Sequence, residues 1–232
     1  MKAFVAGATG LTGRFVVQSL VKEGVEVAAH VRPDSKRLEE WTRRFGEIGA
    51  QVDTTAWSKP TMEQRFAQDP PDLVFSLLGT TKKREKTGGG DYQSVDFGLT
   101  AILIDALKCS PTTRFVYLSS LGTKEGVSSA YLKARWMAED HLRRSGLPHL
   151  IARPSFILGD RDESRLMETI GGGVSDVLIG AVGFLGARKF ARRVGSIQGS
   201  ELGEGLVREA LLWPENNRTL YSNDLRTPTN NK

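Results

Sequence analysis

The sequence has few of the features that mark secreted, membrane or metal-binding proteins. Its 232 residues include one cysteine, Cys109, so an internal disulfide is excluded. No apolar run reaches the roughly 18 residues of a membrane span. No side chains have metal-ligand spacing, and we predict no metal site. Met1 and Lys2 lead into an apolar strand rather than a signal peptide. Together with the single cysteine, this predicts a cytoplasmic protein.

Basic residues outnumber acidic ones, with 32 Lys and Arg against 27 Asp and Glu and a net charge of +5. This excess favours anionic ligands. The basic residues are scattered and not interleaved with aromatic side chains, so the pattern argues against nucleic acid as a partner. A phosphorylated cofactor explains the charge more economically.

Three glycines follow the first apolar strand at three-residue spacing, at Gly7, Gly10 and Gly13, and a helical pattern begins directly after them. A glycine turn between a strand and a helix is typical of a nucleotide phosphate site. The free N–H groups and the positive end of the helix dipole favour an anion there. An ordinary glycine turn is the alternative. The residues predicted to bind the diphosphate of a dinucleotide are Gly7, Thr9, Gly10, Leu11, Thr12 and Gly13.

Strand patterns alternate with helical patterns along the chain. We expect strands at residues 3–6, 25–31, 50–54, 73–78, 114–119 and 150–152, and helices after 11, at 36–45, 61–68, 95–106, 131–144 and 200–212. Residues 221–226 are expected to form a short last strand. This order predicts an α/β protein with a doubly wound parallel sheet, the Rossmann architecture, in one domain of 232 residues. Residues 155–232 are expected to contribute a small substrate or lid lobe.

The end of the second strand distinguishes the two nicotinamide dinucleotides. An acidic residue there binds the ribose hydroxyls, whereas an arginine accommodates a 2′-phosphate. Here Arg32 and Arg37 follow the strand, and their guanidinium groups suit phosphate. NADP(H) is therefore favoured over NAD(H), although Asp34 is a counter-signal and the cations could instead be a solvated helix start.

Two further strand ends are expected to contact the cofactor. Leu78, Gly79 and Thr80 follow the fourth strand, where Gly79 would let the chain pass close to the ribose. Arg153 and Pro154 follow the sixth strand and would line the nicotinamide end.

The candidate chemistry lies at Ser120, which ends the fifth strand, and at Tyr131, which opens the next helix. Arg135 lies four residues later on the same helical face. A tyrosine near a serine and a cation suits hydride transfer, because the hydroxyl gives a proton to a carbonyl oxygen that the serine orients. Core and capping roles are the structural alternative for the serine and the tyrosine.

The motifs together resemble an atypical or extended short-chain dehydrogenase/reductase, in the NAD(P)-binding Rossmann superfamily with NmrA-like proteins. The Tat-interacting-protein-like branch is the most similar. The resemblance is carried by residues 7–14, 78–81, 95–96, 118–120, 131–135, 153–154 and 159–165. It implies that Ser120 and Tyr131 take the catalytic serine and tyrosine roles.

One position departs from the family pattern, because Arg135 stands where the family has lysine. Arginine keeps the charge, but its rigid fork does not replace an ammonium group on the nicotinamide ribose. Carbonyl reduction of a small-molecule substrate is the leading function. The alternative is an NADP(H)-sensing regulatory module that binds a protein partner.

An apolar stretch with a basic end, residues 174–193, has three possible uses. It could cover the substrate pocket as a lid, pack as a core helix, or contact a membrane surface.

Overall fold

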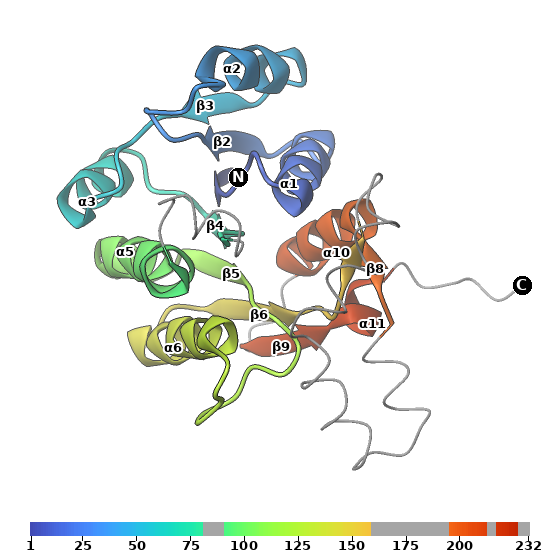
Figure 1. Ribbon diagram of the computed structural model, residues 1–232. Helices are drawn as coiled ribbons and strands as arrows, with labels where there is room; N and C mark the ends of the chain where they lie inside the picture. Colours follow the sequence, from blue (N-terminus) through green and yellow to red (C-terminus); the bar gives the residue numbers. More distant parts are fainter. Residues whose placement is uncertain (81–90, 159–194, 213–216, 227–232) are drawn as a thin grey trace, which may run out of the picture.

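A computed structural model describes residues 1–80, 91–158, 195–212 and 217–226. In Figure 1 helices pack on both faces of one central sheet, so the molecule has three layers. The sheet has seven strands in the order β3-β2-β1-β4-β5-β6-β9, and every neighbouring pair is parallel. This is the expected doubly wound Rossmann architecture, which is confirmed.

The first half of the sheet follows the order that the sequence predicts. Its strands are β1 (Lys2–Ala6), β2 (Glu26–His30), β3 (Gln51–Asp53) and β4 (Leu73–Ser76). The helices between them are α1 (Leu11–Lys22), α2 (Leu38–Glu47) and α3 (Lys59–Gln68). Strand order reverses at β1, which pairs with β2 on one side and β4 on the other. A reversal of this kind opens a crevice at the carboxyl ends of the strands, where ligands bind.

The second half begins with a helix made of three consecutive segments. A π-helical turn, η1 (Gln93–Gly98), leads into α5 (Leu99–Ala106) and a short 3₁₀ turn, η2 (Leu107–Cys109). Then follow β5 (Arg114–Leu118), α6 (Ala130–Ser145) and β6 (His149–Arg153). Single π-helical turns inside α-helices are frequent at functional sites. This one places Asp96 in the interior, with none of its surface exposed.

Two apolar cores lie on opposite faces of the sheet. One joins the strands to α1, α2 and the C-terminal helix α10 (Gly199–Leu211), and includes Val16, Leu20, Phe45 and Leu206. The other joins them to α3, α5 and α6. The central strands are therefore buried on both faces, which explains their continuous apolar sequences.

The C-terminal part differs from the sequence prediction. Residues 221–226 are not a strand: β9 is Arg218–Tyr221 and Ser222–Leu225 form a helical turn, α11. The Asp224 carboxylate accepts the Tyr221 N–H at 2.8 Å, and such a cap starts a helix rather than extending a strand. A small sheet of β7 (Ile157–Leu158) and β8 (Ile197–Gln198) was not foreseen. The stretches 159–165 and 174–193 lie outside the described residues.

Helix α10 (Gly199–Leu211) packs tightly on α1, the helix that follows the glycine turn. A Cβ atom on Gly203 would lie 2.6 Å from the Phe15 Cβ, and one on Gly199 would lie 3.0 Å from the Leu11 side chain. Glycine at both positions therefore lets the two helices approach closely. Through this contact, the C-terminal part of the chain supports the N-terminal end of α1.

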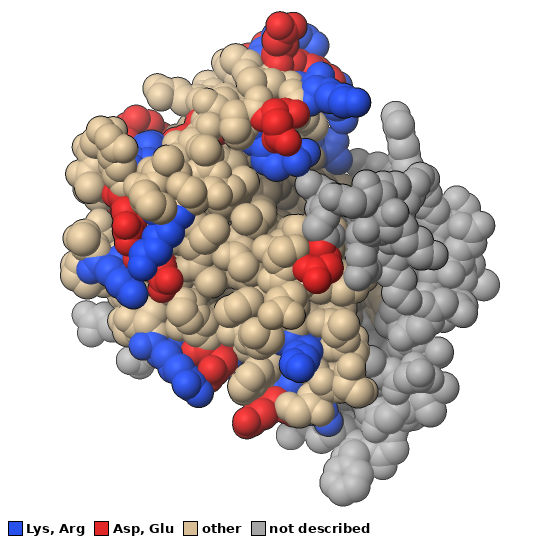
Figure 2. Space-filling view, turned by 60° about the vertical axis from the view of Figure 1, so that its left-hand side comes forward, with Lys and Arg blue, Asp and Glu red and all other residues tan. Residues whose placement is uncertain are grey.

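The face shown in Figure 2 carries mixed charge. Lys and Arg side chains lie beside Asp and Glu, with uncharged surface between the clusters. Some ion pairs of the protein join residues one turn apart on a helix, such as Arg43 with Glu47 on α2 at 2.7 Å. The basic excess does not form a single patch on this face.

Candidate functional site

The glycine turn forms a sharp elbow between β1 and α1. Gly7 has a φ of +82°, which favours glycine, and a Cβ there would lie 2.7 Å from the Leu77 carbonyl oxygen. The Gly10 N–H donates to the Gly7 carbonyl at 2.9 Å. Gly10 is also the N-cap of α1, so no side chain caps this helix. Its first turn has no acidic residue either, which leaves the positive helix end available to an anion.

A cavity of about 520 Å³ opens from this elbow. Of the residues that the sequence predicts to bind cofactor, six line it: Gly7, Thr9, Gly10, Arg32, Leu78 and Gly79. Its other lining residues were not predicted, and they are His30, Val31, Pro33, Asp34, Ser35, Ala56, Trp57, Leu77, Val95 and Leu99. The cavity therefore joins the ends of β1, β2, β3 and β4, where a doubly wound sheet binds ligands.

The two arginines expected near the adenosine ribose lie in different places. Arg32 lines the cavity, with a weak ion pair to Asp34 at 3.6 Å and a half-exposed side chain. Arg37 is outside the lining. Its guanidinium donates twice to Glu40, at 2.6 and 2.8 Å, and lies over the Trp41 ring. Only Arg32 is placed to meet a ligand in this cavity.

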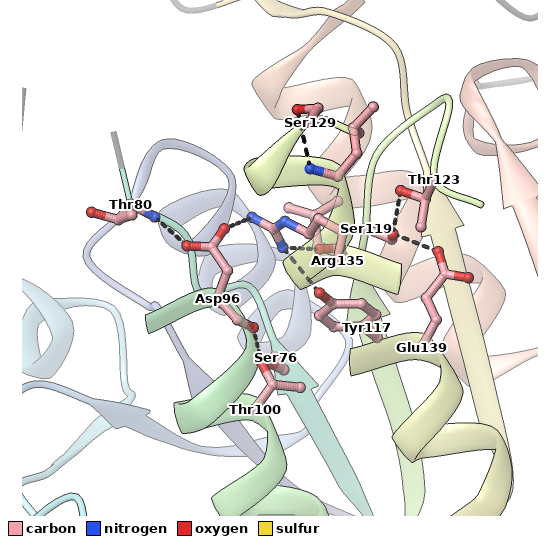
Figure 3. Close-up of polar contacts among 12 residues, drawn as sticks. Ser76, Thr80, Asp96, Thr100, Tyr117, Ser119, Thr123, Ser129, Arg135 and Glu139 are labelled. Carbon is pink, nitrogen blue, oxygen red and sulfur yellow. Dashed lines mark hydrogen bonds and ion pairs between the residues drawn. The ribbon is translucent and has the colours of Figure 1, made fainter. Parts of the chain in front are cut away.

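Arg135 is held in the interior by an acidic partner (Figure 3). Its guanidinium lies 2.8 Å from the Asp96 carboxylate and donates to the Leu118 carbonyl at 2.5 Å. Asp96 also accepts the Thr80 N–H at 2.9 Å. Burial would lower the pKa of Arg135, but Tyr131, Tyr117 and Asp96 raise it above the usual value, so this group stays charged. Burial raises the pKa of Asp96 against the opposing effect of Arg135.

The Arg135 guanidinium fills the space beside Gly79. A Cβ on Gly79 would lie 2.7 Å from the Arg135 Nη2 atom, so a larger residue here would displace the guanidinium from this position. From the sequence, the cofactor ribose was the expected neighbour of Gly79. Two buried polar atoms near it, Thr80 Oγ1 and Arg135 Nε, have no hydrogen-bond partner among the described residues. A polar group of a ligand beside Gly79 would satisfy such atoms.

Tyr131 lies at the start of α6, where the Ser129 side chain caps the helix by accepting the Leu132 N–H. The Arg135 guanidinium lies over its ring, 5.2 Å from the centroid, and the Tyr92 ring packs against it edge-on at 5.4 Å. Arg135 lies 5.8 Å from the ring centroid of the buried Tyr117 as well. The single cation is thus shared between Asp96 and two tyrosines.

Ser120 is fixed by the residues around it. The Ser119 N–H donates to Ala152 at 2.7 Å, and the Leu121 N–H donates to Pro154 at 2.8 Å. The Ser120 carbonyl accepts the Thr123 hydroxyl at 2.8 Å. Pro154 therefore acts on the loop of Ser120 through its carbonyl, and it lies outside the lining of the cavity.

Glu139 on α6 connects the ends of two strands, although its side chain has no exposed surface. It accepts the Ser119 hydroxyl at 2.6 Å, Arg153 at 2.8 and 2.5 Å, and Arg143 at 2.7 Å. Burial would raise the pKa of Glu139, but hydrogen bonds from Arg153 and Ser119 and the nearby charges lower it below the usual value. The Arg153 guanidinium, expected at the nicotinamide, is committed to this carboxylate.

Glu139→Gln is expected to lower the free energy of unfolding at pH 7 by about 3 kcal/mol, because Arg153 loses its charged partner. A carboxylate with a lowered pKa stabilises the folded state above its unfolded pKa of about 4.3, and this contribution disappears as pH falls through the folded value. The difference between the variant and the wild type should therefore shrink below about pH 4 in urea titrations. Asp140→Asn on the same helix, with an exposed ion pair to Arg144, is the matched control and should cost under about 1 kcal/mol. A constant Glu139→Gln difference across this pH range would contradict the assignment.

The arrangement fits a dinucleotide on observations of this chain alone. The elbow offers free helix N–H groups, Arg32 supplies a cation at the β2 end, and polar atoms near Gly79 lack partners. A scan of known families agrees: the model described as NAD(P)H-binding matches residues 7–176. The chain belongs to the NAD(P)H-binding family. The resemblance drawn from the motifs is confirmed.

Several relatives in this family have been named. The protein FMP52-1, mitochondrial, of Scheffersomyces stipitis is 29% identical over 201 residues, which cover 85% of this chain and 86% of the relative. Subunit 9 of the mitochondrial NADH dehydrogenase [ubiquinone] 1 alpha subcomplex of Mus musculus is 29% identical and covers 69% of this chain and 41% of its own. The chloroplastic protein TIC 62 of Arabidopsis thaliana is 28% identical, and the match covers 76% of this chain and 30% of the relative.

Solved structures show the same fold. A putative NAD-dependent epimerase/dehydratase from Bacillus halodurans has a TM-score of 0.58 and 26% identity, over 69% of this chain and 73% of that one. UDP-glucose 4-epimerase from Bifidobacterium longum, in complex with NAD⁺ and UDP, has a TM-score of 0.68 at 17% identity. The match covers 96% of this chain and 78% of that one. The second likeness is one of fold alone.

The expectation of a cytoplasmic protein is wrong, because relatives of this chain are named as mitochondrial. It depended in part on the scarcity of cysteine, and cysteine content does not distinguish one reducing compartment from another. Within the described residues, no helix is both long and apolar enough to cross a membrane. The described part of the chain also contains no group of three His, Cys, Asp or Glu side chains that could hold a metal ion.

Proposed function

We propose that this protein binds NADP(H) and reduces a small carbonyl compound by hydride transfer. The cavity that runs from the Gly7–Gly10 elbow to Arg32 carries the proposal. The elbow would hold the diphosphate, and the guanidinium of Arg32 would bind the 2′-phosphate that distinguishes NADP from NAD. Gly79 and the buried polar atoms beside it would lie at the nicotinamide ribose. The bound reduced nicotinamide would supply the hydride.

The residues of the chain would handle the proton. Tyr131 would donate its hydroxyl proton to the carbonyl oxygen of the substrate, and Ser120 would orient the same oxygen. Two backbone hydrogen bonds and one from the Thr123 hydroxyl hold the loop of Ser120 in place, which supports a positioning role. Arg135 would keep positive charge beside the Tyr131 ring.

A second function is favoured by one contact, the ion pair of Arg135 with Asp96. A guanidinium shared with a carboxylate acts less strongly on Tyr131 than the free ammonium of the family pattern would. The protein would then sense NADP(H) and act through a protein partner. One relative is named as a subunit of a larger assembly, which supports this alternative.

Oxidation of NADPH with a panel of aldehydes and ketones separates the two functions. For an accepted substrate, Tyr131→Phe is expected to lower kcat at least about 100-fold, the usual contribution of a general acid. Calorimetric affinity for NADPH should stay within about threefold of the wild type, because the ring and its contact with Arg135 remain. Unchanged turnover in Tyr131→Phe would remove Tyr131 as the acid. Tight NADPH binding by the wild type without turnover of any carbonyl would favour the sensor.

A further inference from the structure

His30 is a buried histidine that the proposed chemistry leaves without a role. It is the last residue of β2 and lines the cavity next to Arg32, with 3% of its surface exposed. Its ring lies 4.6 Å from the Trp57 ring in an edge-on arrangement and 5.6 Å from the Phe4 ring. Trp57 follows β3 and also lines the cavity. The side chains of His30 and Trp57 form one wall at this end of the cavity.

The protonation state of His30 follows from its contacts. Its Nε2 atom lies 2.8 Å from the Thr55 carbonyl oxygen, which can only accept, so Nε2 carries the hydrogen. Burial lowers the pKa of His30 below its usual value, against the raising effects of Thr55 and Asp53 and with a small contribution from Arg32. The ring is therefore neutral at pH 7. In a neutral ring with hydrogen on Nε2, Nδ1 is a hydrogen-bond acceptor.

The position of the base follows from the two phosphate sites. If the elbow holds the diphosphate and Arg32 binds the 2′-phosphate, the adenosine ribose lies between them. The base attached to that ribose then lies at the end of the cavity lined by His30, Ala56 and Trp57. An aromatic wall suits a purine, because a flat π-system packs well against aromatic rings.

We infer that His30 and Trp57 form a purine subsite in which His30 Nδ1 accepts a hydrogen bond from the exocyclic amino group of adenine. This inference rests on the proposed binding of NADP(H) and adds the recognition of its base. A purine with an oxo group at the same position presents a lone pair to Nδ1 and forfeits the bond. Sites built to bond a ligand N–H discriminate against analogues that lack it, because the protein group is left unpaired.

The test compares NADPH with its reduced hypoxanthine analogue, in which an oxo group replaces the adenine amino group and the phosphates and nicotinamide are unchanged. Calorimetric titration of the wild type at pH 7.5 is expected to give about tenfold tighter binding of NADPH, the effect of one hydrogen bond of about 1.4 kcal/mol. In His30→Phe the two affinities should agree within about twofold. Equal affinities in the wild type would overturn the inference without any variant.

His149→Phe is the matched control. His149 is also buried, bonds a backbone carbonyl through its ring at 2.9 Å, and has a pKa lowered by burial, but it lies on β6 outside the cavity lining. This variant should keep the tenfold preference. A preference that survives in His30→Phe would overturn the inference while leaving NADP(H) binding intact. Failure of both ligands to bind the wild type would instead overturn the proposed cofactor site, and the purine subsite with it.

Discussion

Gly13→Ala is expected to destabilise the folded protein by about 3 kcal/mol and to abolish NADPH binding, because it overpacks backbone against backbone. The new Cβ would lie 2.1 Å from the Gly7 carbonyl oxygen and 2.8 Å from the Ala8 Cα. Neither atom belongs to a side chain that could turn aside. The Gly7 carbonyl also accepts the Gly10 N–H, so any shift distorts the elbow itself. Urea unfolding and a calorimetric titration with NADPH measure both effects.

Gly46→Ala is the matched control for this substitution. Gly46 lies within α2, its φ is not positive, and no heavy atom lies within 4 Å of an added Cβ. Alanine is the better helix former by about 1 kcal/mol, so this variant should be as stable as the wild type or more so. A Gly13→Ala protein that unfolds like Gly46→Ala and still binds NADPH would show that the elbow tolerates a side chain, contrary to the packing described above.

Asp96→Ala is expected to lower the free energy of unfolding by about 3–5 kcal/mol, the cost of leaving a buried charge without its partner. Arg135 has only 5% of its surface exposed and stays charged at any pH at which the protein folds. The substitution also removes the acceptor of the Thr80 N–H, so the loop beside Gly79 loses its anchor. Thermal and urea unfolding at pH 7 provide the measurement.

A double variant separates this charge effect from simple loss of packing. Asp96→Leu with Arg135→Met removes both charges and should recover most of the stability, because apolar pairs of similar volume often replace buried ion pairs without loss. Glu47→Ala, which breaks the exposed pair with Arg43, is the control and should cost under about 1 kcal/mol. Additive losses at positions 96 and 135 would contradict a buried ion pair that acts as a unit.

Periodic and local signals in the sequence were sufficient for the fold. The alternation of buried strands with helices predicts the parallel sheet, and the spacing of Gly7, Gly10 and Gly13 predicts the elbow. The last strand was misplaced because β9 ends at Tyr221, where the Asp224 carboxylate accepts the Tyr221 N–H and a helical turn begins. Helix and strand patterns are difficult to distinguish over so few residues.

The partners of charged side chains could not be predicted in the same way. A sequence gives the sign of a charge, but contacts between distant segments decide which opposite charge neutralises it. Arg153 was expected at the cofactor, and the structure pairs it with Glu139, fourteen residues earlier on α6. Asp96 appeared only within a motif match, and its role emerges where η1 brings it to Arg135.

The cavity lining was predicted only where a motif or a strand-end rule marked it. Gly7, Thr9 and Gly10 belong to the glycine motif, and Arg32 was found from the rule for the β2 end. His30 was not among the predicted residues, yet its position at the carboxyl end of β2 is itself the signal that could have identified it. The assignment of every site residue to cofactor or substrate stays a prediction.

The central claim is that the elbow between β1 and α1 binds the diphosphate of NADP(H). A crystal structure of the protein grown with NADPH tests it most directly. We predict diphosphate density at the N-terminus of α1, within hydrogen-bond distance of the free backbone N–H groups of residues 11–13, and the 2′-phosphate at Arg32. Diphosphate density elsewhere on the molecule, with the elbow in contact only with protein atoms, would contradict the claim.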